Sequence, residues 1–128
     1  MAPDRTVLIV EDDPVTSDLL AVFLRTRRYR VLTAVDAMQG LTLAHREQPD
    51  VVLLDIGMPA GGGLSCWDRM ARSDRTRHIP VIIMTANPRP ELAEQARARG
   101  AAGFFAKPVD LDALAEHLAR VLVAAGST

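Results

Sequence analysis

Acidic residues follow two of the short apolar runs in this sequence, and their type and placement could support phosphate chemistry. Three acids come directly after the first run: Glu11, Asp12 and Asp13. Asp55 comes directly after Val51–Leu54. Converging carboxylates repel one another unless a cation neutralises them, and an oxygen-only cluster suits Mg²⁺ (or Mn²⁺) better than Zn²⁺. Beside a bound metal ion, Asp55 could act as a nucleophile that forms an acyl phosphate.

A hydroxyl and an amine follow two further apolar runs. Thr85 comes after Val81–Met84, where its hydroxyl could donate to a phosphoryl oxygen. Lys107 comes after Gly103–Ala106 and is the only lysine among 15 basic residues, the other 14 being arginine. Its compact ammonium could pair with Asp55 and then with a transferred phosphoryl group, for which a forked guanidinium is a poor substitute.

Each of these residues also has an ordinary structural interpretation. Asp13 is expected to cap a helix, and the two acids before it could complement the dipole of that helix. Asp55 and Thr85 could be turn or cap residues. Lys107 could be a solvated surface side chain, a weak alternative in a chain that otherwise uses arginine.

Short runs rich in Val, Ile and Leu are typical of strands buried on both faces of a parallel sheet. Five such runs are present, two of them weaker: 7–10, 30–34, 51–54, 81–84 and 103–106. Segments with helical spacing follow them: 15–23, 37–47, 64–72, 92–99 and 111–122. This alternation predicts an α/β fold, (βα)5, with a doubly wound five-stranded parallel sheet. Ligands bind such folds where the strands end, which is where the polar residues lie.

Turn and cap residues agree with these elements. Gly100 is expected to end the fourth helix and Asp110 to cap the fifth. We expect the stretch 60–63, Ala-Gly-Gly-Gly, to form a flexible loop. Three residues of the third helix are expected to be structural: Cys66, Trp67 and Met70. Three histidines are expected at the surface: His45, His78 and His117.

Size and charge exclude several classes of protein. The 128 residues, 48% of them hydrophobic and 24% charged, suit one globular domain, which we expect over 1–128 with a core of about 5–125. The net charge of −1 gives no general reason to expect direct binding to nucleic acid or to a membrane. Cys66 cannot form an internal disulfide, and no signal peptide or membrane span is recognisable, so we expect a cytoplasmic protein.

Four stretches of the sequence resemble the receiver domain of bacterial two-component response regulators, the CheY-like family. They are VLIVEDDP at 7–14, DVVLLDIGMP at 50–59, IPVIIMTA at 79–86 and GFFAKP at 103–108. Each stretch alone is moderately specific, but all four in this order and spacing are highly specific. The resemblance covers about 5–125 and implies a flavodoxin-like strand order of 2-1-3-4-5.

The resemblance implies functions for the residues of the acidic site. By this resemblance, Asp55 lies at the position of the family's phosphoacceptor, the aspartate that takes a phosphoryl group from a histidine kinase or a histidine phosphotransfer protein. By the same resemblance, Asp12 lies at the position of a direct metal ligand, and Glu11 at that of an acid that contacts the metal through a bound water. Asp55 and the backbone carbonyl of Gly57 would complete the metal site. Gly57 and Asn87 lie where relatives tune water access and hence the lifetime of the phosphoryl group.

The resemblance also implies a switch. Thr85, Ala86 and Lys107 would hold the phosphoryl group, and Phe104 lies where the family has its switch aromatic, often tyrosine. Movement of Thr85 toward the phosphoryl group would let Phe104 turn inward. That would repack the face made by the fourth helix, fifth strand and fifth helix, which a partner could read. We prefer strand packing for Phe105.

No output domain follows the last helix in this sequence, so the resemblance implies a stand-alone regulator, a monomer or weak dimer that signals to an effector by protein–protein contact. A module cut from a larger protein would look the same. Such a regulator is not an enzyme beyond catalysing its own phosphorylation and dephosphorylation. A phosphorelay intermediate would use the same residues.

Two other classes are weaker alternatives. A phosphatase of the haloacid-dehalogenase type has its nucleophile after the first strand and a second acid two residues later, whereas position 57 is glycine. A flavodoxin-like nucleotide binder is hinted at only by Gly61–Gly63, a loop without a phosphate-binding lysine.

Overall fold

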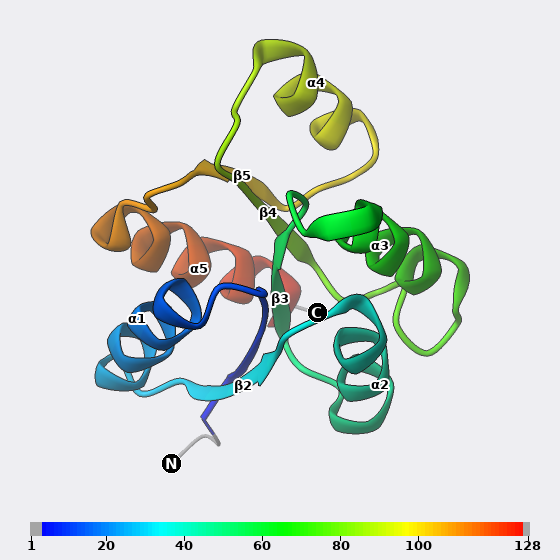
Figure 1. The fold of residues 1–128 in the computed structure, drawn as a ribbon. Helices are drawn as coiled ribbons and strands as arrows, with labels where there is room; N and C mark the ends of the chain where they lie inside the picture. The colour runs from blue at the N-terminus through cyan, green and yellow to red at the C-terminus, as the bar shows by residue number, and fades with distance from the viewer. Residues whose placement is uncertain (1–3, 127–128) are drawn as a thin grey trace.

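The computed structural model describes residues 4–126, which form a five-stranded parallel sheet with helices on both faces (Figure 1). The strand order β2-β1-β3-β4-β5 confirms the predicted (βα)5 fold and its 2-1-3-4-5 order. The elements are β1 (Thr6–Val10), α1 (Pro14–Thr26), β2 (Arg30–Ala34), α2 (Ala37–Glu47), β3 (Val51–Asp55), a 3₁₀ turn (Pro59–Gly61), α3 (Gly62–Arg72), β4 (Val81–Thr85), α4 (Pro90–Ala98), β5 (Gly103–Ala106) and α5 (Leu111–Gly126). The ends of the expected domain, 1–3 and 127–128, lie outside the described residues.

The hydrophobic core has two halves, one on each face of the sheet. The three central strands β1, β3 and β4 are buried at every position, as their continuous apolar runs predict. One half of the core packs α1 and α5 against the sheet, and the other packs α2, α3 and α4. The second half includes Cys66, Trp67 and Met70, as expected, and burial raises the pKa of the Cys66 thiol to about 11.

The helix α1 forms where predicted, but its apolar spacing misidentifies the buried face. Val15, Leu19 and Val22 are 73%, 57% and 61% exposed. The residues that α1 buries include two small ones: Ser17, Leu20, Ala21 and Leu24. Two sets of residues on α1 therefore follow the spacing of a helix face. The set with the smaller side chains, which includes Ser17 and Ala21, packs on the sheet.

The glycine-rich stretch 60–63 is not a flexible loop. It completes the 3₁₀ turn, with Gly61 at a φ of 69°, and then begins α3. A Cβ atom at Gly63 would lie 2.2 Å from the backbone oxygen of Asp55. Gly63 is thus required by the close approach of α3 to the end of β3, where any side chain would collide with backbone.

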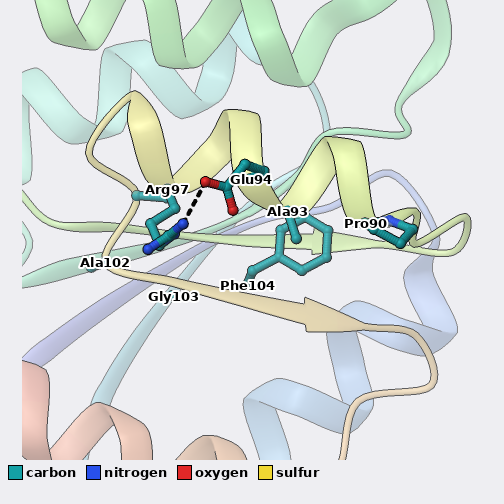
Figure 2. Close-up of a pocket in the computed structure, with 8 residues that line it drawn as sticks. Pro90, Ala93, Glu94, Arg97, Ala102, Gly103 and Phe104 are labelled. Carbon is teal, nitrogen blue, oxygen red and sulfur yellow. Dashed lines mark hydrogen bonds and ion pairs between the residues drawn. The ribbon is translucent and has the colours of Figure 1, made fainter.

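The two phenylalanines of β5 lie in different halves of the core. Phe104 packs with the α2–α4 half and borders a hollow of about 330 Å³ between α4 and β5, opposite Pro90 and Ala93 (Figure 2). Phe105 packs with the α1–α5 half, as preferred from the sequence. The alternation is that of a strand, whose successive side chains point to opposite faces.

His117 does not lie free at the surface as expected. Its Nε2 is 2.6 Å from the carbonyl oxygen of Ala102, and its ring meets that of Phe105 edge-on at a centroid distance of 5.5 Å. His117 therefore fastens α5 to the start of β5. The expected caps are present: Gly100 has a φ of 90° just beyond α4, and Asp110 accepts from the N–H of Ala113.

Within residues 4–126, no helix is both long enough and apolar enough to cross a bilayer.

Candidate functional site

The topology brings the ends of four strands to one edge of the sheet. β1 and β3 are direct neighbours with Val10 opposite Leu54, so the residues that follow Val10 lie beside Asp55. β4 and β5 continue the same edge, with Thr85 opposite Ala106 and Lys107 next along the chain. Residues scattered over 96 positions of sequence thus meet because parallel strands end together.

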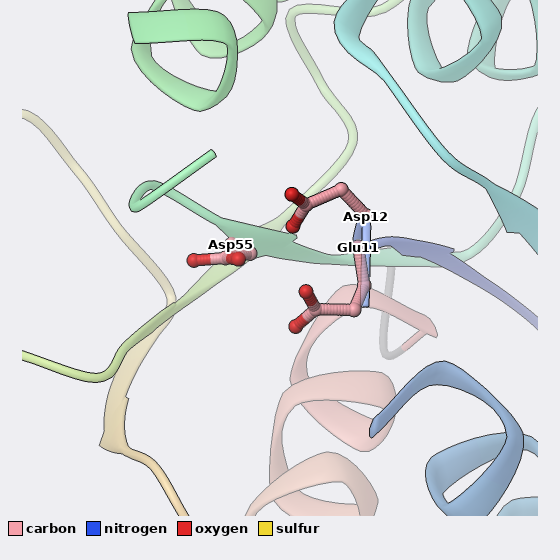
Figure 3. Close-up of side chains that lie close together, drawn as sticks. All are labelled: Glu11, Asp12 and Asp55. Atoms are coloured by element: carbon pink, nitrogen blue, oxygen red, sulfur yellow. The ribbon is translucent and has the colours of Figure 1, made fainter. Parts of the chain in front are cut away.

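The acids Glu11, Asp12 and Asp55 converge at this edge (Figure 3). Each offers one carboxylate oxygen, and these oxygens lie within 4.8 Å of one another. Glu11 and Asp55 are buried, at 1% and 4% exposure, whereas Asp12 is exposed. A compact set of oxygen donors with one side open to solvent fits a hard divalent cation such as Mg²⁺, as the sequence predicts.

Lys107 lies inside this cluster of acids. Its Nζ donates to Oδ2 of Asp55 at 3.0 Å and also contacts Oε1 of Glu11 directly. Burial alone would lower the pKa of Lys107, but its contacts with the two carboxylates hold that pKa above the ordinary value. The one lysine of the chain is therefore a charged ammonium that two buried acids share.

Glu11 does not titrate like an ordinary carboxyl group. Burial raises its pKa to about 7, and the nearby charge of Asp55 acts in the same direction. Contact with Lys107 and a hydrogen bond from the N–H of Asp13 at 3.1 Å oppose that rise without cancelling it. The single ammonium of Lys107 thus neutralises the negative charge of the two buried acids only in part. A further positive charge at this site would therefore be stabilised.

Asp55 is held at both carboxylate oxygens. Oδ1 accepts from the backbone N–H of Gly57 at 2.7 Å, and Oδ2 accepts from Lys107. A Cβ atom at position 57 would lie 3.2 Å from Oδ1, so glycine leaves the approach to this oxygen less crowded than any other residue would. The carboxylate is therefore fixed in orientation, and its Gly57 side is less crowded than a side chain at position 57 would leave it.

Thr85 ends β4 as a buried residue, 4% exposed. Its hydroxyl oxygen accepts from the N–H of Asn87 at 3.1 Å, and its carbonyl accepts from the N–H of Lys107 at 2.8 Å. Ala86 and Asn87 are exposed beside it. Phe104 is placed three residues before Lys107, toward α4 and away from the acids. The Lys107–Pro108 peptide bond is cis.

Sequence reasoning missed two residues that shape the site. Gly63 lets the first turn of α3 pack on the backbone of Asp55, and the only signal for it was a run of glycines soon after the strand. Asp13 does cap α1 through Thr16, yet its backbone N–H also holds the carboxylate of Glu11. Backbone contacts of this kind carry no residue-type signature, so composition and spacing do not reveal them.

The fold and this arrangement of acids, hydroxyl and lysine define an α/β domain with an acidic site at one edge of its parallel sheet. Comparison with known proteins places this domain in a family. The family profile described as "Response regulator receiver domain" matches residues 7–119. The chain therefore belongs to the response regulator receiver domains.

Individual relatives agree. Protein PilH of Pseudomonas aeruginosa is 34% identical over 116 residues, which are 91% of this chain and 96% of PilH. The DNA-binding dual master transcriptional regulator RpaA of Synechocystis is 38% identical over 115 residues, 90% of this chain. This chain spans only 46% of the length of RpaA.

One solved structure with a similar fold holds a metal ion. The receiver domain of sensor histidine kinase PA1611 from Pseudomonas aeruginosa has a TM-score of 0.83 and 29% identity, covering 93% of this chain and 98% of that chain. That structure has a magnesium ion coordinated in its active site cleft. In this chain, Glu11, Asp12 and Asp55 form a group of acids that could hold a metal ion.

Proposed function

We propose that this chain is a phosphorylation-dependent switch of a two-component system in which Asp55 accepts the phosphoryl group. The observation that carries the proposal is how the Asp55 carboxylate is held, with one oxygen on the N–H of Gly57 and the other on Lys107, inside the acid cluster. Phosphoryl transfer depends chiefly on positioning and charge neutralisation, and this geometry provides both.

The donor in this proposal is a histidine kinase or a histidine phosphotransfer protein. A carboxylate oxygen of Asp55 forms the new P–O bond while the P–N bond of the phosphohistidine breaks, and the electron pair of that bond returns to the imidazole nitrogen. Mg²⁺ (or Mn²⁺), held by Glu11, Asp12, Asp55 and the carbonyl of Gly57, supplies positive charge for the transferred group when bound. Lys107 supplies a second positive charge from the position where it already contacts Asp55.

The phosphorylated state then differs from the free state in charge and hydrogen bonding. The phosphoryl group adds about one negative charge and three acceptor oxygens at Asp55. Thr85 and the backbone at Ala86 bind it, which turns the Thr85 hydroxyl away from Asn87. Phe104 then turns inward from the hollow under α4, and the α4-β5-α5 face is repacked for an effector protein. Gly57 and Asn87 set how readily water reaches the phosphoryl group.

The remaining expectations from the sequence complete the proposal. The chain acts in the cytoplasm as a monomer or weak dimer, and it catalyses no reaction except its own phosphorylation and dephosphorylation.

Intact-mass measurement tests the proposal. The protein is incubated with a small acyl phosphate, with and without Mg²⁺, and we expect one phosphoryl adduct that requires the metal. Asp55→Asn should abolish the adduct, whereas the matched control Asp74→Asn, which changes an exposed carboxylate on the α3–β4 loop, should not. An adduct that persists in Asp55→Asn contradicts the assignment.

The labelled protein also separates a terminal switch from a phosphorelay intermediate. It is mixed with a purified histidine phosphotransfer protein, and the phosphoryl group is followed in both. Rapid return of the label to the histidine supports the relay, and retention on Asp55 with altered effector binding supports the switch.

A further inference from the structure

The charges of this molecule are sorted between the two edges of the sheet. Of the 14 arginines, 12 lie in the last turns of helices, in the loops after them or at the start of strands: Arg5, Arg25, Arg27, Arg28, Arg30, Arg46, Arg69, Arg72, Arg75, Arg77, Arg97 and Arg99. In a (βα)5 fold all of these places belong to the amino edge of the sheet, opposite Asp55 (Figure 1). The net charge of −1 is a sum that says nothing about this placement.

Helix dipoles account for only part of the pattern. A cation in the last turn of a helix is favoured by the dipole, which covers Arg25, Arg46 and similar residues. It does not cover arginines outside the helices, such as Arg75. Arg28 is the clearest exception, because its φ of 73° lies in the left-handed region, where glycine or asparagine is the ordinary choice.

Five of these arginines form a continuous basic strip, defined as Arg5, Arg28, Arg30, Arg46 and Arg75. Arg75 donates to the carbonyl of His45 at 3.1 Å, which joins the α3–β4 loop to the end of α2. Glu47 then holds Arg46 and Arg30 together, each at 3.0 Å.

The strip continues from Arg30 to the first strand. The N–H of Arg30 donates to the carbonyl of Arg5 at 2.8 Å, and Arg5 pairs with Asp50 at 3.6 Å. Arg28 lies in the turn just before Arg30. The two carboxylates of this strip therefore hold guanidiniums in position while they neutralise only part of the positive charge.

The strip has a surplus of positive charge. Its five exposed guanidiniums face only the two half-buried carboxylates of Glu47 and Asp50. Arg25, Arg69 and Arg72 add further charge around it, and none of them forms an ion pair within residues 4–126. The flanking Asp4 and the Asp74–Arg77 pair reduce this surplus only locally.

We propose that this basic strip binds the phosphate backbone of a nucleic acid, independently of base sequence. The planar guanidinium fork matches a phosphate group in two hydrogen bonds, and here it is presented repeatedly from one preorganised edge. Backbone binding of this kind needs positive charge along a surface, which the strip provides. Because the strip lies opposite Asp55, the nucleic acid leaves the phosphoacceptor edge free.

The distribution of exposed apolar side chains favours a nucleic acid over a membrane or an acidic protein. Four of the seven exposed large apolar residues among the described positions lie near the starts of helices, at the opposite edge: Val15, Val35, Met38 and Leu64. A membrane surface or a tight protein interface would need apolar contacts beside the charges.

Fluorescence anisotropy with a labelled mixed-sequence DNA duplex tests the proposal. At low salt we expect a Kd on the order of 10 μM and a slope of log K against log[salt] of about −3 to −4, since roughly four phosphates are neutralised. Arg46→Gln/Arg75→Gln should weaken binding at least ~5-fold and flatten the slope by about 2. The matched control Arg89→Gln/Arg120→Gln, which removes the same charge outside the strip, should bind normally.

Arg28→Gly separates binding from folding. It relieves the left-handed conformation and should keep or raise the thermal stability while it weakens DNA binding ~2-fold or more. Asp55→Asn should bind DNA as the unchanged protein does, so this test does not depend on the proposed phosphorylation. No binding at low salt, equal loss in the control double variant, or equal binding to anionic vesicles or polyglutamate overturns the proposal.

Discussion

The ammonium of Lys107 touches two buried carboxylates at once, and few other groups could do so. Its side chain is only 16% exposed and sits between Glu11 and Asp55. A guanidinium is larger, planar and forked, so it would have to displace one acid to pair with the other.

We therefore expect Lys107→Arg to fold and to keep Mg²⁺-dependent stabilisation, but to accept the phosphoryl group at least ~10-fold more slowly, because the charge no longer lies at Asp55. Rates of adduct formation by intact mass, with thermal unfolding in Mg²⁺ as the folding control, measure this. Unchanged labelling and switching in the variant would mean that the single lysine has no special function.

Glu11 predicts an unusual dependence of stability on pH. Its pKa is near 7 in the folded chain and 4.5 in an ordinary carboxyl group, so the folded state binds this proton more tightly. The contribution of Glu11 to the free energy of unfolding is therefore greatest below pH 4.5 and is lost as pH rises to about 7.

Denaturant unfolding in metal-free buffer between pH 4.5 and 8 measures this contribution. Glu11→Gln should reduce the loss of stability between pH 4.5 and 7, whereas Glu91→Gln, an exposed change in the first turn of α4, should leave it intact. Stabilisation by Mg²⁺ should grow over the same interval, because the metal ion competes with the proton for this carboxylate. Equal profiles for the two variants would assign the pH dependence to other groups.

At the scale of elements, the contact between α3 and β3 leaves no space for a side chain at Gly63. Gly63→Ala would place a Cβ atom 2.2 Å from the carbonyl oxygen of Asp55. Because the colliding atom belongs to the backbone, no side-chain rotation can remove the clash. We expect it to lower the free energy of unfolding by about 3 kcal/mol or more.

Gly61→Ala is the matched control, because a Cβ atom there meets nothing within 4 Å and only the φ of 69° disfavours it. Gly61→Ala should lower the free energy of unfolding by about 1 kcal/mol. Denaturant unfolding of both variants decides the point, and a cost at Gly63 no larger than that at Gly61 would show that α3 can move away from the strand.

The helix α4 is anchored more weakly than its neighbours. Ala96 is the one buried residue of α4, and a hollow of about 330 Å³ lies between α4 and β5. Few buried contacts mean a low free energy for local opening, so amides in 90–98 should exchange fastest among the helices away from the chain ends. Hydrogen exchange by mass spectrometry tests this, with α3 as the internal reference, and faster exchange in α3 would contradict it.

At the scale of the whole molecule, the sequence predicted the fold well because its signals are periodic. The apolar runs that became β1, β3 and β4 are buried at every position, and prolines and aspartates mark where helices begin. The site followed from the fold, since strand ends in a parallel sheet meet at one edge.

What the sequence could not predict depends on distances between backbones and on which of two similar stripes faces inward. α1 has two stripes with helical spacing, and only packing shows that Ser17 and Ala21 lie inside while Val15 lies outside. Gly63 reads as a loop residue until α3 is placed on β3. The contact of His117 could not be predicted because it is made with a backbone carbonyl, which every residue type offers.

With most of the arginines at one edge of the sheet and the buried acid cluster at the other, the molecule is also an electric dipole directed along its strands. In the field of a positively charged partner such a dipole rotates during approach, so the edge that holds Glu11, Asp12 and Asp55 arrives first. The fraction of productive encounters then exceeds that of a uniformly charged body and falls as ionic strength rises. A chain with a net charge of only −1 can thus be oriented by its partner before contact, through charge placement alone.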